Sequence, residues 1–260
     1  GKLVSISVKV GIYDGCNHVC DYCDEAKLLN AFPPIDKVQE FCDFLEDNSK
    51  EYQISFEGNE PMMRLDLCLS LMNRGCPIIL FTNGTLITKD VLTAIPRNVE
   101  FRVSLDGTER LHNRHRIMKN GGNSFKEAME GINLLVKDNR PFTIATTVTD
   151  ETLEIMNELG EFFKTIPANR FVLTCCMFDD DNGIHTQAIY DAAAPSVKEW
   201  GIKNLTLYSY GKREPKAKAE MEILFNPHRV EVHREGYATP NLKTFSYDEY
   251  ELKEVRQYFI

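Results

Sequence analysis

Three cysteines, Cys16, Cys20 and Cys23, form a C-x3-C-x2-C cluster directly after the first β-like run of the chain. This spacing brings three thiolates together on one short loop. A structural zinc site is usually closed by four protein ligands, and a common iron–sulfur cluster by four cysteines. Three thiolates leave one coordination position open, which is where a metal site does chemistry. The triplet therefore predicts a reactive metal or cluster centre; the alternative is a zinc site completed by His18 or a remote residue.

Polar motifs follow the next three predicted strands, at the point where each strand ends. They are Glu57-Gly58-Asn59-Glu60-Pro61, Thr82-Asn83-Gly84 and Ser104-Leu105-Asp106-Gly107. In parallel α/β folds, the loops at the carboxyl ends of the strands build the active site. We therefore expect these motifs to meet the cysteine triplet on one rim of a sheet.

Short β-rich runs alternate with helical patterns over residues 1–200. We predict strands over Val4–Ile12, Gln53–Glu57, Ile78–Thr82, Glu100–Leu105, Phe142–Val148 and Phe171–Met177. We predict helices over Val19–Leu29, Ile35–Asp47, Arg64–Arg74, Thr88–Ala94, Phe125–Asp138 and Leu153–Thr165. Asp36 and Ser124 are the expected N-caps of two of these helices. Six strand–helix units imply parallel strands with right-handed crossovers, and the expected fold is an α/β, open partial (β/α)6 TIM-like barrel.

The sequence pattern changes after Trp200, and residues 201–260 are predicted to form a short C-terminal extension. A strand is expected over Asn204–Tyr210, a hairpin around Asn226-Pro227 and a final helix over Tyr247–Phe259. The barrel is expected to occupy residues 1–200.

The chain is acidic, with a formal net charge of −9 and a pI near 5.3. We therefore expect neither a nucleic-acid partner nor an anionic membrane surface. The sequence holds no apolar run of the roughly 18 residues that a membrane-spanning helix needs. Eight cysteines without a secretory signal favour a reducing compartment, so the expected location is the cytoplasm.

The triplet, with an aromatic residue (Tyr22) before its third cysteine and a GGEP-like turn at 58–61, resembles the radical S-adenosylmethionine (radical SAM) enzymes. The stretch that begins at Ser104-Leu105-Asp106-Gly107 and continues through His112, Arg116, Gly121 and Ser124 is similar to the subgroup of anaerobic sulfatase-maturating enzymes and peptide-modifying maturases. The similarity covers roughly residues 4–180.

The resemblance implies that Cys16, Cys20 and Cys23 hold one [4Fe–4S] cluster, whose fourth iron chelates the amino and carboxylate groups of S-adenosylmethionine. Reductive cleavage of the sulfonium would then give a 5′-deoxyadenosyl radical, which abstracts hydrogen from a substrate. An electron donor such as flavodoxin or ferredoxin is implied as a partner.

The same resemblance implies the residues that bind S-adenosylmethionine. The turn formed by Gly58, Asn59 and Glu60 would meet the methionyl amino group, with Glu60 as an anionic acceptor. Ser104 would contact the ribose, Arg116 would pair with the methionyl carboxylate, and Tyr22 belongs to the same cofactor-binding set.

Two features depart from the subgroup pattern. Asn59 replaces the second glycine of the turn, and Asn tolerates left-handed backbone geometry better than other non-glycine residues. The auxiliary-cluster cysteines of the maturases are missing, because no residue after Cys176 is a cysteine. We therefore expect a single cluster in these 260 residues.

Strand parity singles out one further cysteine. Arg102, Ser104 and Asp106 share one face of their strand, and Cys176 shares the corresponding face with Thr174. Cys176 is therefore a candidate to donate a hydrogen atom to a substrate radical; a small buried hydrophobic residue is the alternative interpretation.

The sequence is compatible with several functions. The leading hypothesis is a radical SAM enzyme that acts on a peptide or protein side chain. The alternatives are a radical SAM enzyme acting on a nucleoside or other small metabolite, and a non-catalytic iron–sulfur or zinc-binding module.

Overall fold

The computed structural model describes residues 6–13, 16–20, 31–176, 183–209, 221–234 and 241–260. Within these residues, ten strands form one sheet in the spatial order β12-β11-β10-β1-β3-β4-β5-β7-β8-β9. The strands are β1 (Ile6–Ile12), β3 (Tyr52–Gly58), β4 (Ile78–Thr82), β5 (Val99–Ser104), β7 (Phe142–Val148), β8 (Arg170–Cys175), β9 (Leu205–Ser209), β10 (Met221–Phe225), β11 (Val230–Arg234) and β12 (Asn241–Phe245). Two short strands, β2 (His18–Cys20) and β6 (Arg116–Met118), pair separately.

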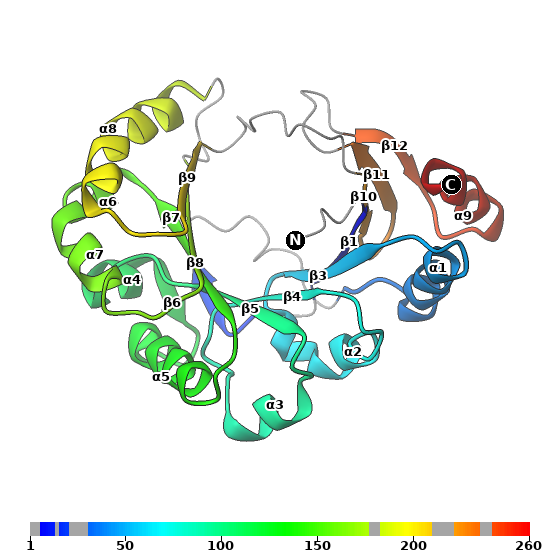
Figure 1. The fold of residues 1–260 in the computed structure, drawn as a ribbon, viewed down its shortest axis with the longest axis horizontal. Helices are drawn as coiled ribbons and strands as arrows, with labels where there is room; N and C mark the ends of the chain where they lie inside the picture. The colour runs from blue at the N-terminus through cyan, green and yellow to red at the C-terminus, as the bar shows by residue number, and fades with distance from the viewer. Residues whose placement is uncertain (1–5, 14–15, 21–30, 177–182, 210–220, 235–240) are drawn as a thin grey trace.

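The sheet curls into an open arc, and the helices cover its outer face (Figure 1). Neighbouring strands run parallel from β10 to β9, whereas β10, β11 and β12 are antiparallel. The helices are α1 (Ile35–Asp47), α2 (Leu65–Leu69), α3 (Lys89–Ala94), α4 (Glu109–His115), α5 (Ser124–Lys137), α6 (Asp150–Leu153), α7 (Met156–Phe163), α8 (Ile184–Trp200) and α9 (Glu249–Arg256). Short 3-10 turns span η2 (Pro61–Arg64) and η3 (Gln257–Phe259). This arrangement confirms the expected α/β fold with an open partial barrel.

The alternation of side chains along the strands explains the two faces of the sheet. In β5, Val99, Phe101 and Val103 are fully buried, and the intervening Arg102 and Ser104 are only partly buried. The apolar set packs under the outer helices, because successive side chains of a strand point to opposite faces. The inner face of β5 therefore carries its polar residues.

The structure adds helix α8, which the sequence pattern did not predict, before β9, which matches the strand predicted over Asn204–Tyr210. Helix α8 connects β8 to β9, and β9 pairs in parallel with β8. The apolar period of α8 is weak, since few of its residues are buried, and Pro195 lies inside the helix. These features explain why the sequence pattern did not predict α8. Packing sets its position, because Gly160 of α7 lies directly against the Trp200 indole.

Several predicted boundaries were wrong by a few residues. Val19 and Cys20, predicted to begin a helix, lie in β2, and the rest of that predicted helix lies outside the described residues. The helix predicted over Arg64–Arg74 is confined to α2. The long helix predicted over Leu153–Thr165 is divided between α6 and α7.

Two predicted N-caps were also misplaced. Asn123, not Ser124, caps α5, because its side-chain oxygen accepts a hydrogen bond from Lys126 N at 2.9 Å. Asp36 lies in the first turn of α1, whose N-cap position is held by Pro34.

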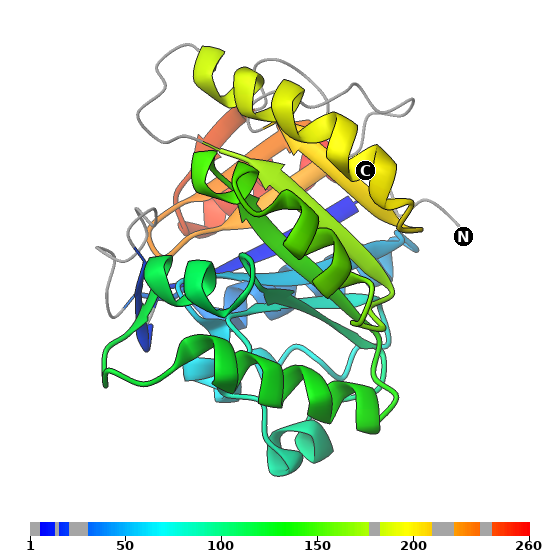
Figure 2. The same ribbon diagram turned by 90° about the vertical axis from the view of Figure 1, so that its left-hand side faces the viewer.

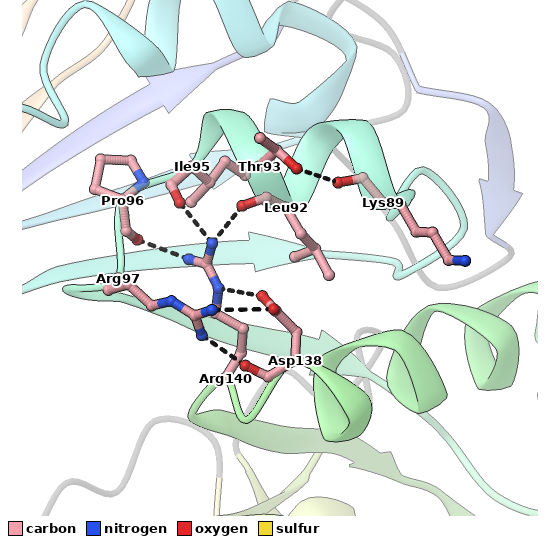
Figure 3. Close-up of polar contacts among 8 residues, drawn as sticks. All are labelled: Lys89, Leu92, Thr93, Ile95, Pro96, Arg97, Asp138 and Arg140. Atoms are coloured by element: carbon pink, nitrogen blue, oxygen red, sulfur yellow. Dashed lines mark hydrogen bonds and ion pairs between the residues drawn. The ribbon is translucent and has the colours of Figure 1, made fainter.

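Arg140 ties the ends of α3 and α5 together beneath the sheet (Figure 3). Its guanidinium donates to the carbonyl oxygens of Pro96 at 2.8 Å, Ile95 at 2.7 Å and Leu92, and it pairs with Asp138 at 2.9 Å. Only 5% of Arg140 is exposed. The arginine therefore gives hydrogen bonds to carbonyls in the last turn of α3 and just beyond it.

The C-terminal segment completes the other edge of the arc. The predicted hairpin is present as β10 and β11, and β10 pairs in parallel with β1. Tyr247 donates a hydrogen bond to the carbonyl of Asn226, and Phe259 packs edge-on against Phe41 of α1. Among the described helices, none combines the length and apolar character needed to cross a membrane.

Candidate active site

The loop that carries the cysteine triplet is joined to the strand that carries Arg116. Strand β2 lies beyond the carboxyl end of β1 (Figure 2) and pairs antiparallel with β6. In this register Cys20 is opposite Arg116. The amide of Lys119 also donates to the carbonyl of Asn17 at 3.0 Å. Backbone pairing therefore brings two separate sequence motifs to one place on the rim.

Cys16 has the surroundings of a metal-binding thiolate. It is partly buried and carries no disulfide, and the amide of His18 donates to its sulfur at 3.4 Å. Amide hydrogen bonds to cysteine sulfur stabilise the thiolate and tune iron–sulfur clusters. The backbone of Cys20 is placed in β2, whereas Tyr22 and Cys23 lie outside the described residues.

A network of buried amides fixes the first part of this loop. Asn83, from the turn after β4, donates to the Asn17 side-chain oxygen at 2.7 Å and lies 3.0 Å from Nδ1 of His18. Asn17 in turn donates to the Thr85 hydroxyl at 2.8 Å. Burial lowers the pKa of His18 to about 4, and the Arg116 charge adds to this effect. Asn83 of the Thr82-Asn83-Gly84 motif therefore holds the cysteine loop in place through Asn17 and the neutral imidazole of His18.

The turn after β3 depends on Gly58. This residue has φ of +128°, and a Cβ there would lie 2.1 Å from the carbonyl oxygen of Ile12. The next amide, that of Asn59, donates to the same carbonyl at 3.3 Å. Asn59 is absent from the described non-glycine residues with positive φ, so the left-handed geometry allowed for it at the sequence level is not used. The turn therefore accepts Asn59 without left-handed strain.

Glu60 lies under the turn with 1% of its surface exposed. One carboxylate oxygen accepts the Thr82 hydroxyl at 2.6 Å, and the other accepts the Asn83 amide at 2.8 Å. Burial raises its pKa to about 7, although these hydrogen bonds and the Arg116 charge favour the ionised form. Glu60 therefore joins the ends of β3 and β4.

The motif after β5 positions Arg116. Asp106 is 1% exposed and accepts Arg116 Nε at 2.6 Å. Its other oxygen accepts the Thr147 amide at 3.0 Å, and its own amide donates to Nδ1 of His112 at 3.1 Å. Burial lowers the pKa of His112 to about 4, so its ring is a neutral acceptor at this point. The Asp106 carboxylate, itself held by the Thr147 amide, thus orients the Arg116 guanidinium.

Ser104 is the last residue of β5, two residues before Asp106, and it is partly exposed. Its hydroxyl makes no hydrogen bond to another residue that the structure describes. A polar group with free capacity at the rim suits contact with a small polar ligand.

Cys176 immediately follows β8, and 5% of it is exposed. Its amide donates to the Val148 carbonyl at 3.2 Å. Burial raises the pKa of its thiol, which keeps the S–H bond intact near neutral pH. The adjacent Cys175 is fully buried, as strand parity requires.

The site residues are matched by a family model of the radical SAM superfamily over residues 10–163. The chain belongs to the radical SAM superfamily. This membership confirms the expected enzyme class and its two cofactors, a [4Fe–4S] cluster and S-adenosylmethionine.

Curated relatives share parts of this radical SAM chain. A serine-type anaerobic sulfatase-maturating enzyme of Bacteroides thetaiotaomicron is 31% identical over 170 residues, covering 58% of the chain and 41% of the relative. An AdoMet-dependent heme synthase of Methanosarcina barkeri is 30% identical, with 59% and 46% covered. A GTP 3′,8-cyclase of Helicobacter pylori is 30% identical, with 57% and 50% covered. The chain thus spans about half or less of these relatives, and the expected likeness to sulfatase-maturating enzymes is confirmed.

Solved structures share the fold at low identity. Native anSMEcpe with bound AdoMet gives a TM-score of 0.68 at 17% identity, covering 96% of this chain and 80% of that one. The same enzyme with AdoMet and the Cp18Cys peptide gives 0.67 at 18% identity, with the same coverage. Streptococcus suis SuiB bound to the precursor peptide SuiA gives 0.59 at 14% identity, with 87% and 58% covered. These likenesses establish the fold alone.

The described residues fit the two cofactors of the superfamily. Cys16 carries no disulfide and has an amide aimed at its sulfur, and the three thiolates of the triplet are the donors that iron–sulfur clusters take. Arg116 and the uncommitted Ser104 hydroxyl lie on the same rim, where the methionyl and ribose groups are expected.

Sequence reasoning missed the residues that support the site. Asn17, Asn83 and Asp106 each hold another motif in place. Asn83 and Asp106 stood inside motifs that had been recognised, so the available signal was their position directly after a buried strand.

Proposed function

We propose that the protein is a radical SAM enzyme that cleaves S-adenosylmethionine reductively at a single [4Fe–4S] cluster and abstracts hydrogen from a peptide or protein side chain. The pairing of Cys20 with Arg116 across β2 and β6 carries the proposal, because it joins the cluster loop to the arginine expected at the methionyl carboxylate. When bound, the cluster and S-adenosylmethionine supply a carbon-centred radical able to take hydrogen from an unactivated C–H bond.

The chain's own residues would hold these groups in a fixed order. Cys16, Cys20 and Cys23 bind the cluster through three thiolates. Arg116, oriented by Asp106, presents guanidinium N–H groups to the methionyl carboxylate. Ser104 accepts or donates a hydrogen bond at the ribose.

The turn after β3 would meet the methionyl amino group through its main chain. Both Glu60 oxygens already accept hydrogen bonds from Thr82 and Asn83. The carboxylate therefore supports the turn through these hydrogen bonds, and its negative charge would attract the methionyl amino group. Gly58 lets the backbone of the turn approach Ile12, and Asn59 continues it. Tyr22 completes the cofactor-binding set that the resemblance implies.

Three remaining assignments accompany the proposal. A single cluster is expected, because no cysteine follows Cys176 in these 260 residues. Its electron would come from a donor such as flavodoxin or ferredoxin. Cys176 is the candidate hydrogen donor to a substrate radical, and its protonated, buried thiol suits that role. Cys176→Ala should change the product, and an unchanged product would remove this role.

A peptide substrate is supported by two kinds of similarity. The sulfatase-maturating relative is a protein-modifying enzyme by name, and two of the similar folds were solved with bound peptides. The heme synthase and GTP cyclase relatives, at the same level of identity, support a small-metabolite substrate as the second candidate.

Deuterium transfer separates these two candidates. The reconstituted protein is given reductant, S-adenosylmethionine and candidate substrates deuterated at the side-chain carbons. A peptide substrate should place deuterium in the released 5′-deoxyadenosine. Transfer from a nucleoside or tetrapyrrole, with none from any peptide, would instead establish the second candidate.

A further inference from the structure

Arg102 lies on the inner face of β5 and has no polar partner. It is half-buried, and the structure gives its guanidinium no hydrogen bond and no ion pair with another described residue. Its Nε is fully buried and unpaired. An unpaired buried donor costs about 1–3 kcal/mol, more when it is charged, so such a group calls for a partner, which can be water, an ion or a ligand.

Arg140 shows how this chain treats an arginine that serves only the fold. Its guanidinium is paired with three carbonyl groups and one carboxylate (Figure 3). Arg102 of β5 is half-buried with its Nε fully buried, yet the structure gives it none of these contacts. The difference indicates that the donors of Arg102 are reserved for a group that binds from outside the chain.

The surroundings of Arg102 fix its plane without using its donors. Its guanidinium carbon lies 4.8 Å from the centre of the Phe81 ring, the neighbour in register on β4. On the other side, Thr143 of β7 is in register with Arg102 and gives its hydroxyl to Glu100 at 2.6 Å. An aromatic face beneath a guanidinium leaves the edge of the fork free to bind a planar anion.

Charges of both signs lie near Arg102. Burial lowers the pKa of Arg102, Arg170 lowers it further, and the carboxylates of Glu100 and Glu57 oppose that shift. Arginine keeps its charge in such a setting. Glu100 is engaged by Thr143, and the described residues offer no carboxylate within ion-pair distance of Arg102.

Arg102 also lies next to the position expected for the ribose. It precedes Ser104 by two residues on the same face of β5, which is a spacing of about 7 Å. Ser104 is the residue expected at the ribose of S-adenosylmethionine. A group held by Arg102 would therefore lie one step deeper in the barrel than the ribose.

We propose that Arg102 binds a carboxylate of the substrate on the inner face of β5 and so selects acidic substrates. The inference rests on the proposed peptide substrate. The carboxylate is supplied either by an acidic side chain or by the C-terminus of the peptide, which present the same planar anion to the fork.

The test follows the Nε–H nitrogen resonance of Arg102 by NMR in the cluster-reconstituted protein with S-adenosylmethionine. The resonance is assigned by its loss in Arg102→Gln. Three N-acetylated tripeptides are titrated. One has a central aspartate and one a central asparagine, both with blocked C-termini, and the third is acetyl-trialanine with a free C-terminus. The aspartate or the free C-terminus should shift the resonance, and the asparagine peptide should not.

Affinity measurements on matched variants complete the test. Binding of the active peptide should weaken at least about tenfold in Arg102→Gln, and less in Arg102→Lys, which keeps the charge but loses the fork. Arg97→Gln is the control, because Arg97 contacts only Asp138 among the described residues and precedes the same strand. The control should bind like the wild type.

Three results would overturn the inference: no shift with either carboxylate peptide, equal shifts with the asparagine peptide, or unchanged affinity in Arg102→Gln. Since binding is read without turnover, these failures are distinct from a failure of the proposed reaction, which would appear as absent 5′-deoxyadenosine. The peptide that shifts the resonance identifies the source of the carboxylate.

Discussion

Glu60 is a carboxyl group enclosed between the ends of β3 and β4, and its burial raises its pKa to about 7. The unfolded chain exposes the same group, which then titrates near 4.5. Between these values the folded state holds more protons than the unfolded state. The contribution of Glu60 to stability is therefore fully present below about pH 4.5 and is lost as the pH rises through 7.

Replacing Glu60 by Gln should remove this pH dependence. We expect the unfolding free energy of the wild type to fall between pH 5 and pH 8 relative to Glu60→Gln, by on the order of 3 kcal/mol at most. Urea unfolding at the two pH values measures the difference. Glu130→Gln, an exposed glutamate of α5, is the control and should follow the wild type. Parallel pH profiles for the wild type and Glu60→Gln would contradict this account.

The ion pair of Arg116 with Asp106 is expected to be important for stability as well as for cofactor binding. Arg116→Ala leaves a carboxylate that is 1% exposed without its ion-pair partner, so stability should drop by about 3–5 kcal/mol. The double variant Arg116→Ala, Asp106→Asn should regain part of the loss, because the remaining group is neutral. Chemical unfolding of the three proteins tests both expectations. A stability loss for Arg116→Ala similar to that of an exposed arginine would argue against the pair.

At the scale of elements, the site depends on loops that approach one another closely at the ends of β1 and β3. Gly58 is the point of closest approach, since an added Cβ would overlap the Ile12 carbonyl. Gly75 is a useful comparison, because it also has positive φ (+75°) but nothing lies within 4 Å of an added Cβ.

Gly58→Ala should therefore cost considerably more than Gly75→Ala. We expect about 1–2 kcal/mol for the comparison variant, from backbone strain alone, and a clearly larger loss at Gly58 together with lost S-adenosylmethionine binding. Calorimetric binding and thermal unfolding report the two effects. Equal losses at the two glycines would show that the close contact with Ile12 does not shape the turn.

Much of this element scale could be predicted from the sequence. The buried strands β1, β3, β4, β5, β7 and β8 were predicted because their apolar runs are bounded by turn residues. The motifs after them were predicted to converge because parallel strands end at one rim. Helix α8 and strand β12 were not predicted, since α8 lacks a clear apolar period and β12 carries no alternating pattern strong enough to mark it.

The supporting contacts of the site were outside the reach of sequence patterns. Asp106 meets Arg116 ten residues away, and Asn83 meets Asn17 across 66 residues. Such pairings depend on how loops fold over the rim, for which a single sequence carries no periodic signal. The choice of Asn123 over Ser124 as a cap has the same origin, because both residues are good caps and local packing decides between them.

For the whole molecule, the C-terminal segment is joined to the barrel through sheet pairing and side-chain packing. β10 pairs with β1 in parallel, and Phe259, with 4% of its surface exposed, packs edge-on against Phe41. The division into residues 1–200 and 201–260 remains a prediction. These contacts lead us to expect one cooperative unfolding transition rather than two.

Phe259→Ala tests this expectation. The variant should lose about 3–5 kcal/mol, and the fluorescence of Trp200, the single tryptophan, should report the loss although it lies at the end of α8. Ile260→Ala, which removes a side chain that is mostly exposed, is the control. If Trp200 fluorescence kept its wild-type transition while far-UV circular dichroism lost amplitude earlier, the C-terminal segment would be an independent unit.

The central claim, that Cys16, Cys20 and Cys23 hold one cluster that cleaves S-adenosylmethionine, is tested most directly by 5′-deoxyadenosine release after anaerobic reconstitution. With dithionite, S-adenosylmethionine and candidate peptides, the wild type should hold about four iron atoms per chain and release 5′-deoxyadenosine. The triple variant Cys16→Ser, Cys20→Ser, Cys23→Ser should release none. Iron near eight or twelve per chain, no release from a fully loaded wild type, or release from the triple variant would contradict the account.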